Sequence, residues 1–116
     1  MTTIYHNPRC SKSRQTLELL RNKGVEPEIV LYLESPIDRA TLIDLLDKLK
    51  LNAGQLVRRS EQDFKDRNLG RDGVDEEQLI AAMLEYPKLI ERPIVVVGDS
   101  ARLGRPPENV LEIIDV

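Results

Sequence analysis

Cysteine, histidine and aromatic residues are scarce in this sequence. Its 116 residues include one cysteine, one histidine and no tryptophan, and aromatic residues make up 3%. A single cysteine excludes an internal disulfide and is more typical of a reducing compartment than of a secreted protein. One cysteine and one histidine also fall short of the three or four ligands of a zinc site, so we expect no metal.

Long apolar segments and a strong charge imbalance are absent as well. No run approaches the roughly 18 apolar residues that span a bilayer, and the start, MTTIYHNPRC, lacks the features of an export signal. The 17 basic and 20 acidic side chains give a net charge of -3, which does not suit a surface that wraps nucleic acid. We therefore expect one cytoplasmic domain over residues 1–116 that binds neither nucleic acid nor a membrane.

The first third of the chain has the pattern of a strand, a helix and a second strand. Thr2 to His6 is β-prone and ends at the turn-forming Asn7-Pro8. Residues 11–22 carry apolar side chains at helical spacing, and Lys23-Gly24 provides the helix end. The apolar run EIVLYL, residues 28–33, predicts a strand buried on both faces. The helical connection favours a parallel pairing of the two strands.

From about residue 36 to residue 90 the pattern is helical, which predicts an insertion between two sheet-forming segments. Ser35 is the expected cap of its first helix, which Pro36 begins. The inward positions of that helix are Leu42, Leu45, Leu46 and Leu49. Further helices are expected at 54–59, 61–69 and 75–85. Asp75 caps the last one, whose expected buried side chains are Leu79, Met83 and Leu84.

The last quarter predicts a hairpin followed by a helix. Arg92-Pro93, where a cis bond is compatible with the sequence, leads into an apolar strand at 94–97. Gly98-Asp99 forms the turn, 101–104 is the return strand, and 106–114 is the final helix. The order βαβ, helices, ββα is α/β. A cysteine at the first βα junction and a proline opening a later strand make this the arrangement of a thioredoxin-like fold, a mixed sheet with a helical insertion between its halves.

Cys10 stands where a thiol is chemically reactive. Because it directly precedes the first helix, the unpaired backbone N–H groups of that helix end point toward the sulfur and stabilise a thiolate. Arg9, Lys12 and Arg14 add positive charge nearby. The alternative is a buried cysteine acting as a small hydrophobe. Polar and charged neighbours on both sides make the reactive thiol the better interpretation.

His6, four residues before the cysteine, admits three roles. An imidazole deprotonates a neighbouring thiol in catalytic pairs. The intervening Asn7-Pro8 turn instead favours a ring that faces the loop backbone, holds the shape of the loop and helps to polarise the cysteine. A solvent-exposed or purely structural histidine fits the sequence equally well.

Three arginines far from the cysteine in sequence stand at element boundaries: Arg58 in LVRRS, Arg92 before a proline, and Arg105 in RLGRPP. The fixed charge and forked donors of arginine suit oxyanions, and several arginines converging on a thiolate would stabilise it. A solvated surface charge or a carboxylate partner is the alternative for each. Sequence spacing does not decide whether they converge.

Five segments, in order and across nearly the whole chain, resemble the glutaredoxin-coupled arsenate reductases, which have a thioredoxin-like fold. These segments are IYHNPRCSKSRQTLELL, LYLESP, LVRR, LIERPIVVV and RLGRPPENVLEII. The resemblance implies that Cys10 attacks arsenate or a similar oxyanion. It also implies that three arginines hold that oxyanion, namely Arg58, Arg92 and Arg105.

The same resemblance extends to the loop before the first helix. His6 falls at the family's histidine, which makes it a second expected catalytic residue, and Ser13 falls at the family's loop serine, expected to bind substrate. Arg59 adjoins Arg58, so a one-residue shift would exchange these two arginines.

A reaction cycle with an external thiol is implied too. In it the Cys10 thiolate displaces an oxygen from As(V), glutathione attacks the adduct, arsenite leaves, and a glutaredoxin resolves the remaining protein–glutathione disulfide. No cofactor stays bound, and glutathione is a co-substrate. The cysteine count leads to the same conclusion without the resemblance. A chain with one cysteine needs a thiol from another molecule to resolve a disulfide formed at that cysteine.

Two other functions remain open at this point. One is a glutathione-dependent thiol reductase acting on another acceptor. The other is a non-catalytic redox-sensing regulator, like the RNA-polymerase-binding relatives of this fold. Those regulators typically carry a CxxC pair, whereas the matching stretch here is Cys10-Ser11-Lys12-Ser13. The plasmid-type reductases of the family also carry a C-terminal extension beyond the position of Val116.

Overall fold

The computed structural model describes residues 1–114 and divides into two compact units. The two ends of the chain form the first unit, and Pro36–Glu91 forms the second. The second unit covers nearly the same range as the expected helical insertion. The assignment of residues 1–116 to a single domain stays a prediction.

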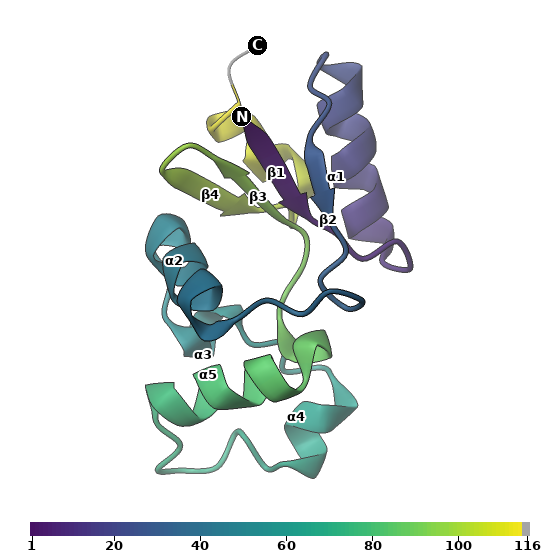
Figure 1. The fold of residues 1–116 in the computed structure, drawn as a ribbon. Helices are drawn as coiled ribbons and strands as arrows, with labels where there is room; N and C mark the ends of the chain where they lie inside the picture. Colours follow the sequence, from purple (N-terminus) through teal and green to yellow (C-terminus); the bar gives the residue numbers. More distant parts are fainter. Residues whose placement is uncertain (115–116) are drawn as a thin grey trace. The chain divides into compact units, whose positions relative to one another are not determined.

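A four-stranded mixed sheet lies at the centre of the first unit (Figure 1). β1 (Thr2–Tyr5) pairs in parallel with β2 (Glu28–Val30) and antiparallel with β3 (Ile94–Val97). β4 (Ser100–Leu103) pairs antiparallel with β3, so the order is β2-β1-β3-β4. This arrangement confirms the predicted α/β class with βαβ and ββα halves.

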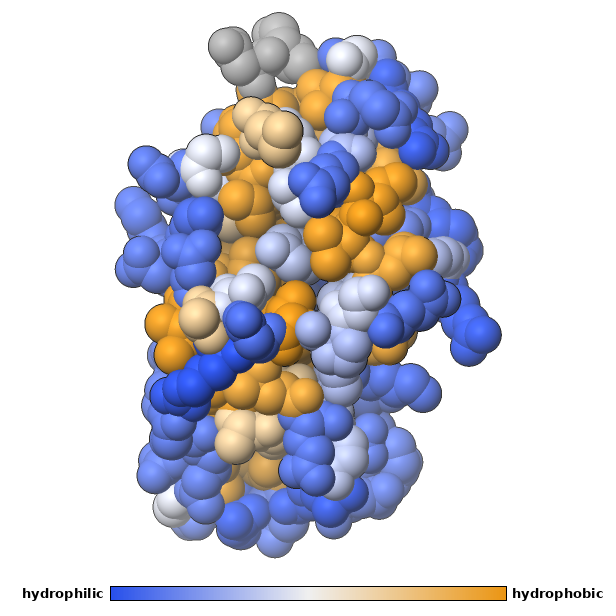
Figure 2. Space-filling model, viewed as in Figure 1, coloured by the Kyte–Doolittle hydropathy of each residue, from blue (hydrophilic) through white to orange (hydrophobic). Residues whose placement is uncertain are grey.

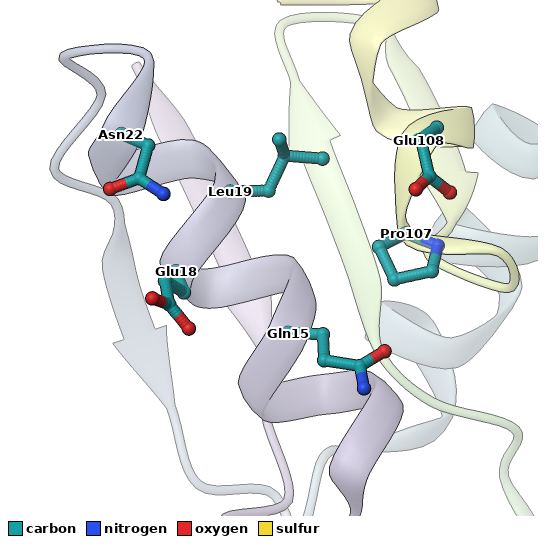
Figure 3. A pocket seen from close by; sticks show the side chains of 6 residues that line it. All are labelled: Gln15, Glu18, Leu19, Asn22, Pro107 and Glu108. Atoms are coloured by element: carbon teal, nitrogen blue, oxygen red, sulfur yellow. The ribbon is translucent and has the colours of Figure 1, made fainter.

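One face of this sheet carries the apolar core of the first unit. α1 (Ser11–Asn22) and the 3₁₀ helix η2 (Pro107–Glu112) lie beside each other on it (Figure 3). The buried members of the core are Ile4, Leu20, Val95, Val110 and Ile114. Side chains alternate between the faces of a strand, so the register partners Ile4 and Val95 point into the same core. Full burial of such a side chain contributes about 1.5–3 kcal/mol.

β2 corrects the expectation for residues 28–33. The strand ends at Val30, and Glu28 and Ile29 are exposed, because β2 is the edge of the sheet and pairs only with β1. Leu31 begins a turn in which its carbonyl accepts hydrogen bonds from two later N–H groups. Tyr32, in that turn, is 1% exposed. This end of the apolar run therefore supplies a buried side chain in the turn and does not extend the strand.

α1 has the predicted bounds. Its end is closed by Gly24 at φ +81, with hydrogen bonds from the Gly24 N–H to the Arg21 carbonyl and from the Val25 N–H to the Leu20 carbonyl. The buried face of the helix is Ser13, Thr16 and Leu20. Two small polar side chains therefore point inward from the half of the helix nearest Cys10.

The segment after β3 differs in two details from the prediction. β4 begins and ends one residue early, which leaves Gly104 outside the strand. The final helix is a 3₁₀ helix shorter than 106–114, and its first turn has an Asn109 N–H bonded to the Pro106 carbonyl three residues back. Arg92-Pro93 and Arg105-Pro106 are both cis.

The second unit is helical. Its elements are α2 (Arg39–Leu49), α3 (Ala53–Leu56), α4 (Gln62–Asp66), α5 (Glu76–Glu85) and the 3₁₀ helix η1 (Pro87–Leu89). The expected inward leucines of α2 are all buried. The cap of α2 is Asp38 and not Ser35, because the Asp38 carboxylate accepts the Thr41 N–H at 2.8 Å. Asp75 caps α5 as predicted, in a capping box with Gln78.

Three helical expectations in this unit need correction. α3 stops at Leu56, since Val57 bridges Ile90 and the Arg58 N–H bonds the Leu89 carbonyl. α4 covers only part of 61–69, because Asn68 adopts φ 50. In α5, Leu79 and Met83 are buried, but Ile80 takes the buried place expected for Leu84.

On the visible face, apolar side chains gather in patches, and polar side chains surround them (Figure 2). The large exposed apolar residues come from different segments: Met1, Ile29, Ile43 and Leu111. Within residues 1–114, no helix has both the length and the apolar composition needed to cross a membrane.

Gly104 provides a test of how tightly the first unit packs. A Cβ at this position would lie 2.4 Å from Thr16 Oγ1 and 2.8 Å from Pro93 Cγ, closer than any ordinary contact. We expect Gly104→Ala to lower the free energy of unfolding by about 1–3 kcal/mol in urea titrations, the usual cost of overpacking.

The matched control is Gly54→Ala, where the nearest atom is 3.4 Å away. This change is expected to be neutral or slightly stabilising. Equal losses in the two variants would contradict the packing argument.

Candidate active site

The register of the sheet explains why three distant segments meet. Tyr5, Ile94 and Leu103 are aligned on adjacent strands. Residues that follow Tyr5, precede Ile94 and follow Leu103 therefore leave the sheet at the same end of the three strands. These residues include the loop that ends at Cys10, then Arg92, and finally Arg105.

Asn7 shapes the loop that carries the cysteine. Its carbonyl accepts the Cys10 N–H at 3.0 Å, and its side-chain oxygen accepts the Arg9 N–H at 3.0 Å. Arg14 closes the loop from α1, donating from Nη1 to the Pro8 carbonyl at 2.9 Å. Sequence reasoning identified Asn7-Pro8 only as a turn. The two Asn7 oxygens are what hold Cys10 at the N-cap of α1.

Cys10 is partly exposed, and its environment favours the thiolate. Burial raises the pKa of the thiol, but backbone N–H groups of Ser13 and Lys12 and hydrogen bonding and charge from Arg92 together lower the pKa below the ordinary value of 9.0. The helix end and the arginine thus outweigh the desolvation. The direction agrees with the expected activation of a thiol at a helix N-terminus.

Two of the three expected arginines lie at the cysteine. Arg105 Nη1 is 3.8 Å from Cys10 Sγ and donates to the Arg92 carbonyl at 3.2 Å. Arg92 is 9% exposed, so its charge is held in a nearly dry position. Guanidinium groups around a thiolate bind an incoming oxyanion through charge-assisted hydrogen bonds.

His6 contacts Ser13. The two side chains are 2.6 Å apart between Nδ1 and Oγ, and the Asn7 N–H donates to the same Oγ at 3.0 Å. His6 is 6% exposed and Ser13 is fully buried. Burial, with the charges of Arg21 and Arg14, lowers the pKa of His6 from 6.5, so the ring is neutral at neutral pH. This contact supports the loop-holding interpretation of His6.

Arg58 belongs to the second unit and is paired there. Its guanidinium lies 3.6 Å from Glu61 and 3.5 Å from Glu91. The neighbouring Arg59 donates to the Gly54 carbonyl and stacks over the Phe64 ring. The carboxylate partner considered for Arg58 from the sequence is therefore present. Its expected role toward substrate stays a prediction.

A separate groove lies between α1 and η2 (Figure 3). Its lining is Gln15, Glu18, Leu19, Asn22, Pro107 and Glu108, none of which is an expected site residue. Two carboxylates repel an oxyanion, so the groove does not suit arsenate. Among the described residues, no group of three or more histidine, cysteine, aspartate or glutamate side chains is placed to hold a metal ion.

The sequence model of the ArsC family matches residues 5–113. The chain belongs to the ArsC family. Arsenate reductase from Haemophilus influenzae is 46% identical over 112 residues, which are 96% of this chain and 97% of that protein. An uncharacterized Escherichia coli protein, YfgD, is 61% identical over 112 residues, or 96% and 94% of the two chains.

Solved structures of ArsC relatives have the same architecture. The structure of arsenate reductase from Vibrio cholerae superposes with a TM-score of 0.94 at 50% identity and covers 97% of each chain. A putative arsenate reductase from Yersinia pestis gives 0.92 at 54% identity, over 97% of this chain and all of that one. The fold is thus thioredoxin-like, as the sequence predicts.

Removing Arg92 tests whether this arginine stabilises the Cys10 thiolate. We expect Arg92→Ala to raise the pKa of the Cys10 thiol, followed as thiolate absorbance in the ultraviolet, because both a hydrogen bond and a charge are lost. Arg9→Ala is the control, since Arg9 is exposed and does not contribute to the shift. The same thiol pKa in both variants would show that Arg92 does not contribute to the ionisation of Cys10.

His6 predicts a dependence of stability on pH. Because its pKa is lower in the folded than in the unfolded chain, the unfolded chain binds more protons below about pH 6.5. Stability should therefore fall as the pH drops from 7 to 5, and His6→Asn should remove that part of the fall. Urea unfolding at several pH values measures both slopes. Parallel slopes in the two proteins would mean that His6 titrates normally in the folded state.

Proposed function

We propose that this protein is an oxidoreductase that converts arsenate to arsenite through the Cys10 thiolate, with glutathione and glutaredoxin as electron donors. The observation that carries the proposal is the guanidinium of Arg105 at 3.8 Å from Cys10 Sγ, beside Arg92. A nucleophile and two fixed cations at one point suit a tetrahedral oxyanion. The arsenate reductases among the ArsC relatives support arsenate as that anion.

The first step forms a sulfur–arsenic bond. The Cys10 thiolate attacks As(V), and one arsenic oxygen leaves as water after taking up protons. Arsenic is still As(V) in this adduct, so no electrons have moved to it. Arg92 and Arg105 offset the negative charge of the arsenate oxygens, which otherwise repel the thiolate.

Reduction occurs in the second step. A glutathione thiolate attacks the Cys10 sulfur, the sulfur–arsenic bond breaks, and its electron pair stays on arsenic, which leaves as arsenite. The product on the protein is a Cys10–glutathione disulfide. Since the sequence has no second cysteine, a glutaredoxin thiol resolves this disulfide. A reducing, cytoplasmic location supplies both partners.

The surrounding residues have supporting roles in this proposal. Neutral His6 and Ser13 hold the loop, so that the helix N–H groups stay aimed at the sulfur and at the bound anion. Arg58, which is paired with Glu61 and Glu91 in the second unit, is included as the third oxyanion ligand on the family resemblance alone.

Turnover by the purified protein tests the proposal. With arsenate, glutathione, glutaredoxin and a coupled NADPH-dependent regeneration of glutathione, we expect NADPH oxidation that requires arsenate. Cys10→Ser should abolish it, because a serine hydroxyl is not ionised at neutral pH and forms no disulfide. Ser11→Ala, at an exposed neighbouring position, is the control and should retain activity.

Two outcomes would overturn the proposal. Arsenate reduction that survives in Cys10→Ser would remove the thiol from the mechanism. Glutathione oxidation that depends on disulfide acceptors and not on arsenate would indicate a thiol reductase instead.

A further inference from the structure

The backbone on both sides of Arg105 is held by side chains that no catalytic role explains. Asn109 Nδ2 donates to the Arg105 carbonyl at 3.2 Å. Thr16 Oγ1 lies within hydrogen-bond distance of the Gly104 carbonyl at 3.3 Å, while it also donates to the Lys12 carbonyl at 2.8 Å. The Arg105 carbonyl is thus held from η2 by Asn109, and the Gly104 carbonyl is contacted from α1 by Thr16, whose single hydroxyl proton is shared with the nearer Lys12 carbonyl. We call Thr16 and Asn109 the carbonyl clamp.

The backbone at Gly104 is tightly packed. Thr16 is fully buried, and even a methyl group at Gly104 would collide with its hydroxyl. The Gly104 N–H donates to the Pro93 carbonyl at 2.9 Å, which ties the same peptide to the segment that carries Arg92. The chain leaving β4 is thus fixed against both α1 and the start of β3.

Arg105 needs such a fixed backbone because its side chain is long. Arginine has several rotatable bonds and loses rotamer entropy when it is held in one place. Its Nη1 makes two directed contacts, with Cys10 Sγ and with the Arg92 carbonyl. Because the same Nη1 makes both contacts, a backbone that holds Arg105 in place favours both of them together.

We infer that Thr16 and Asn109 are positioning residues, which hold Arg105 against the Cys10 sulfur and thereby set the affinity of the site for its oxyanion. The part of this inference that concerns arsenate rests on the proposed function. The part that concerns the thiol does not, because the ionisation of Cys10 is measurable without any substrate.

Thr16→Val removes the hydroxyl and Asn109→Leu removes the amide donor, each with little change in side-chain size. Thr16→Ser keeps the hydroxyl and removes only the methyl group. Asn22→Leu is the control, since Asn22 is exposed on α1. We expect Thr16→Val and Asn109→Leu to raise the thiol pKa and to raise the KM for arsenate by about 10-fold with a smaller change in kcat. Thr16→Ser and Asn22→Leu should match the parent protein.

A double-mutant cycle separates positioning from a general structural effect. In an Arg105→Ala background, neither Asn109→Leu nor Thr16→Val should shift the thiol pKa further, because the group they position is gone. The same shift with and without Arg105 would overturn the inference and assign the effect to α1 itself. If Thr16→Val fails to fold, the half-buried Asn109 decides the question.

An unchanged thiol pKa in both single variants would also overturn the inference. A shifted thiol pKa in a protein that does not reduce arsenate would leave the carbonyl clamp in place and refute only the proposed function.

Discussion

The ionisation of one sulfur atom depends on a balance between burial and the donors around it. Removing Cys10 from water raises the pKa of its thiol, and this is the largest single influence on it. The N–H groups at the start of α1 and the Arg92 guanidinium together exceed that cost. Neither source is independent of the fold, because the helix end needs the Asn7 loop and the arginine needs the sheet register.

Strand pairing brings the cysteine loop and the two arginines together. β1, β3 and β4 are aligned so that the cysteine loop, Arg92 and Arg105 lie at the same end of the strands. Rigid strands fix the positions of the charges before any anion arrives, which reduces the reorganisation that binding requires. The tight contact between Gly104 and Thr16 continues this rigidity beyond the end of β4.

The sequence was informative where a pattern has a single physical reading. The bounds of α1 and β3 were predicted because a proline, a glycine end and apolar runs mark them sharply. The strand at 28–33 was overextended, since composition does not distinguish an edge strand from apolar side chains that pack a turn. The cap at Ser35 was wrong because Asp38 competes for the same role three residues later.

The residues of the candidate site could be predicted from the sequence, but most contacts between them could not. Cys10, Arg92 and Arg105 could be named from local chemistry and family resemblance, yet their distances follow from long-range strand pairing. The sequence pointed to a loop-holding role for His6 without naming Ser13 as its partner, and the Asn109 bond to the Arg105 carbonyl carried no sequence signal. Arg58 has one carboxylate partner close in sequence, Glu61 three residues later, and a second one, Glu91, from a distant part of its unit.

The central claim is that the fold itself ionises Cys10, and one measurement tests it most directly. Because the chain has a single cysteine, the rate of alkylation by iodoacetamide as a function of pH reports on that thiol alone, in native protein and in urea-unfolded protein alike. The account predicts a midpoint at lower pH in the native protein than in the unfolded chain. A native midpoint equal to or above that of the unfolded chain would contradict it.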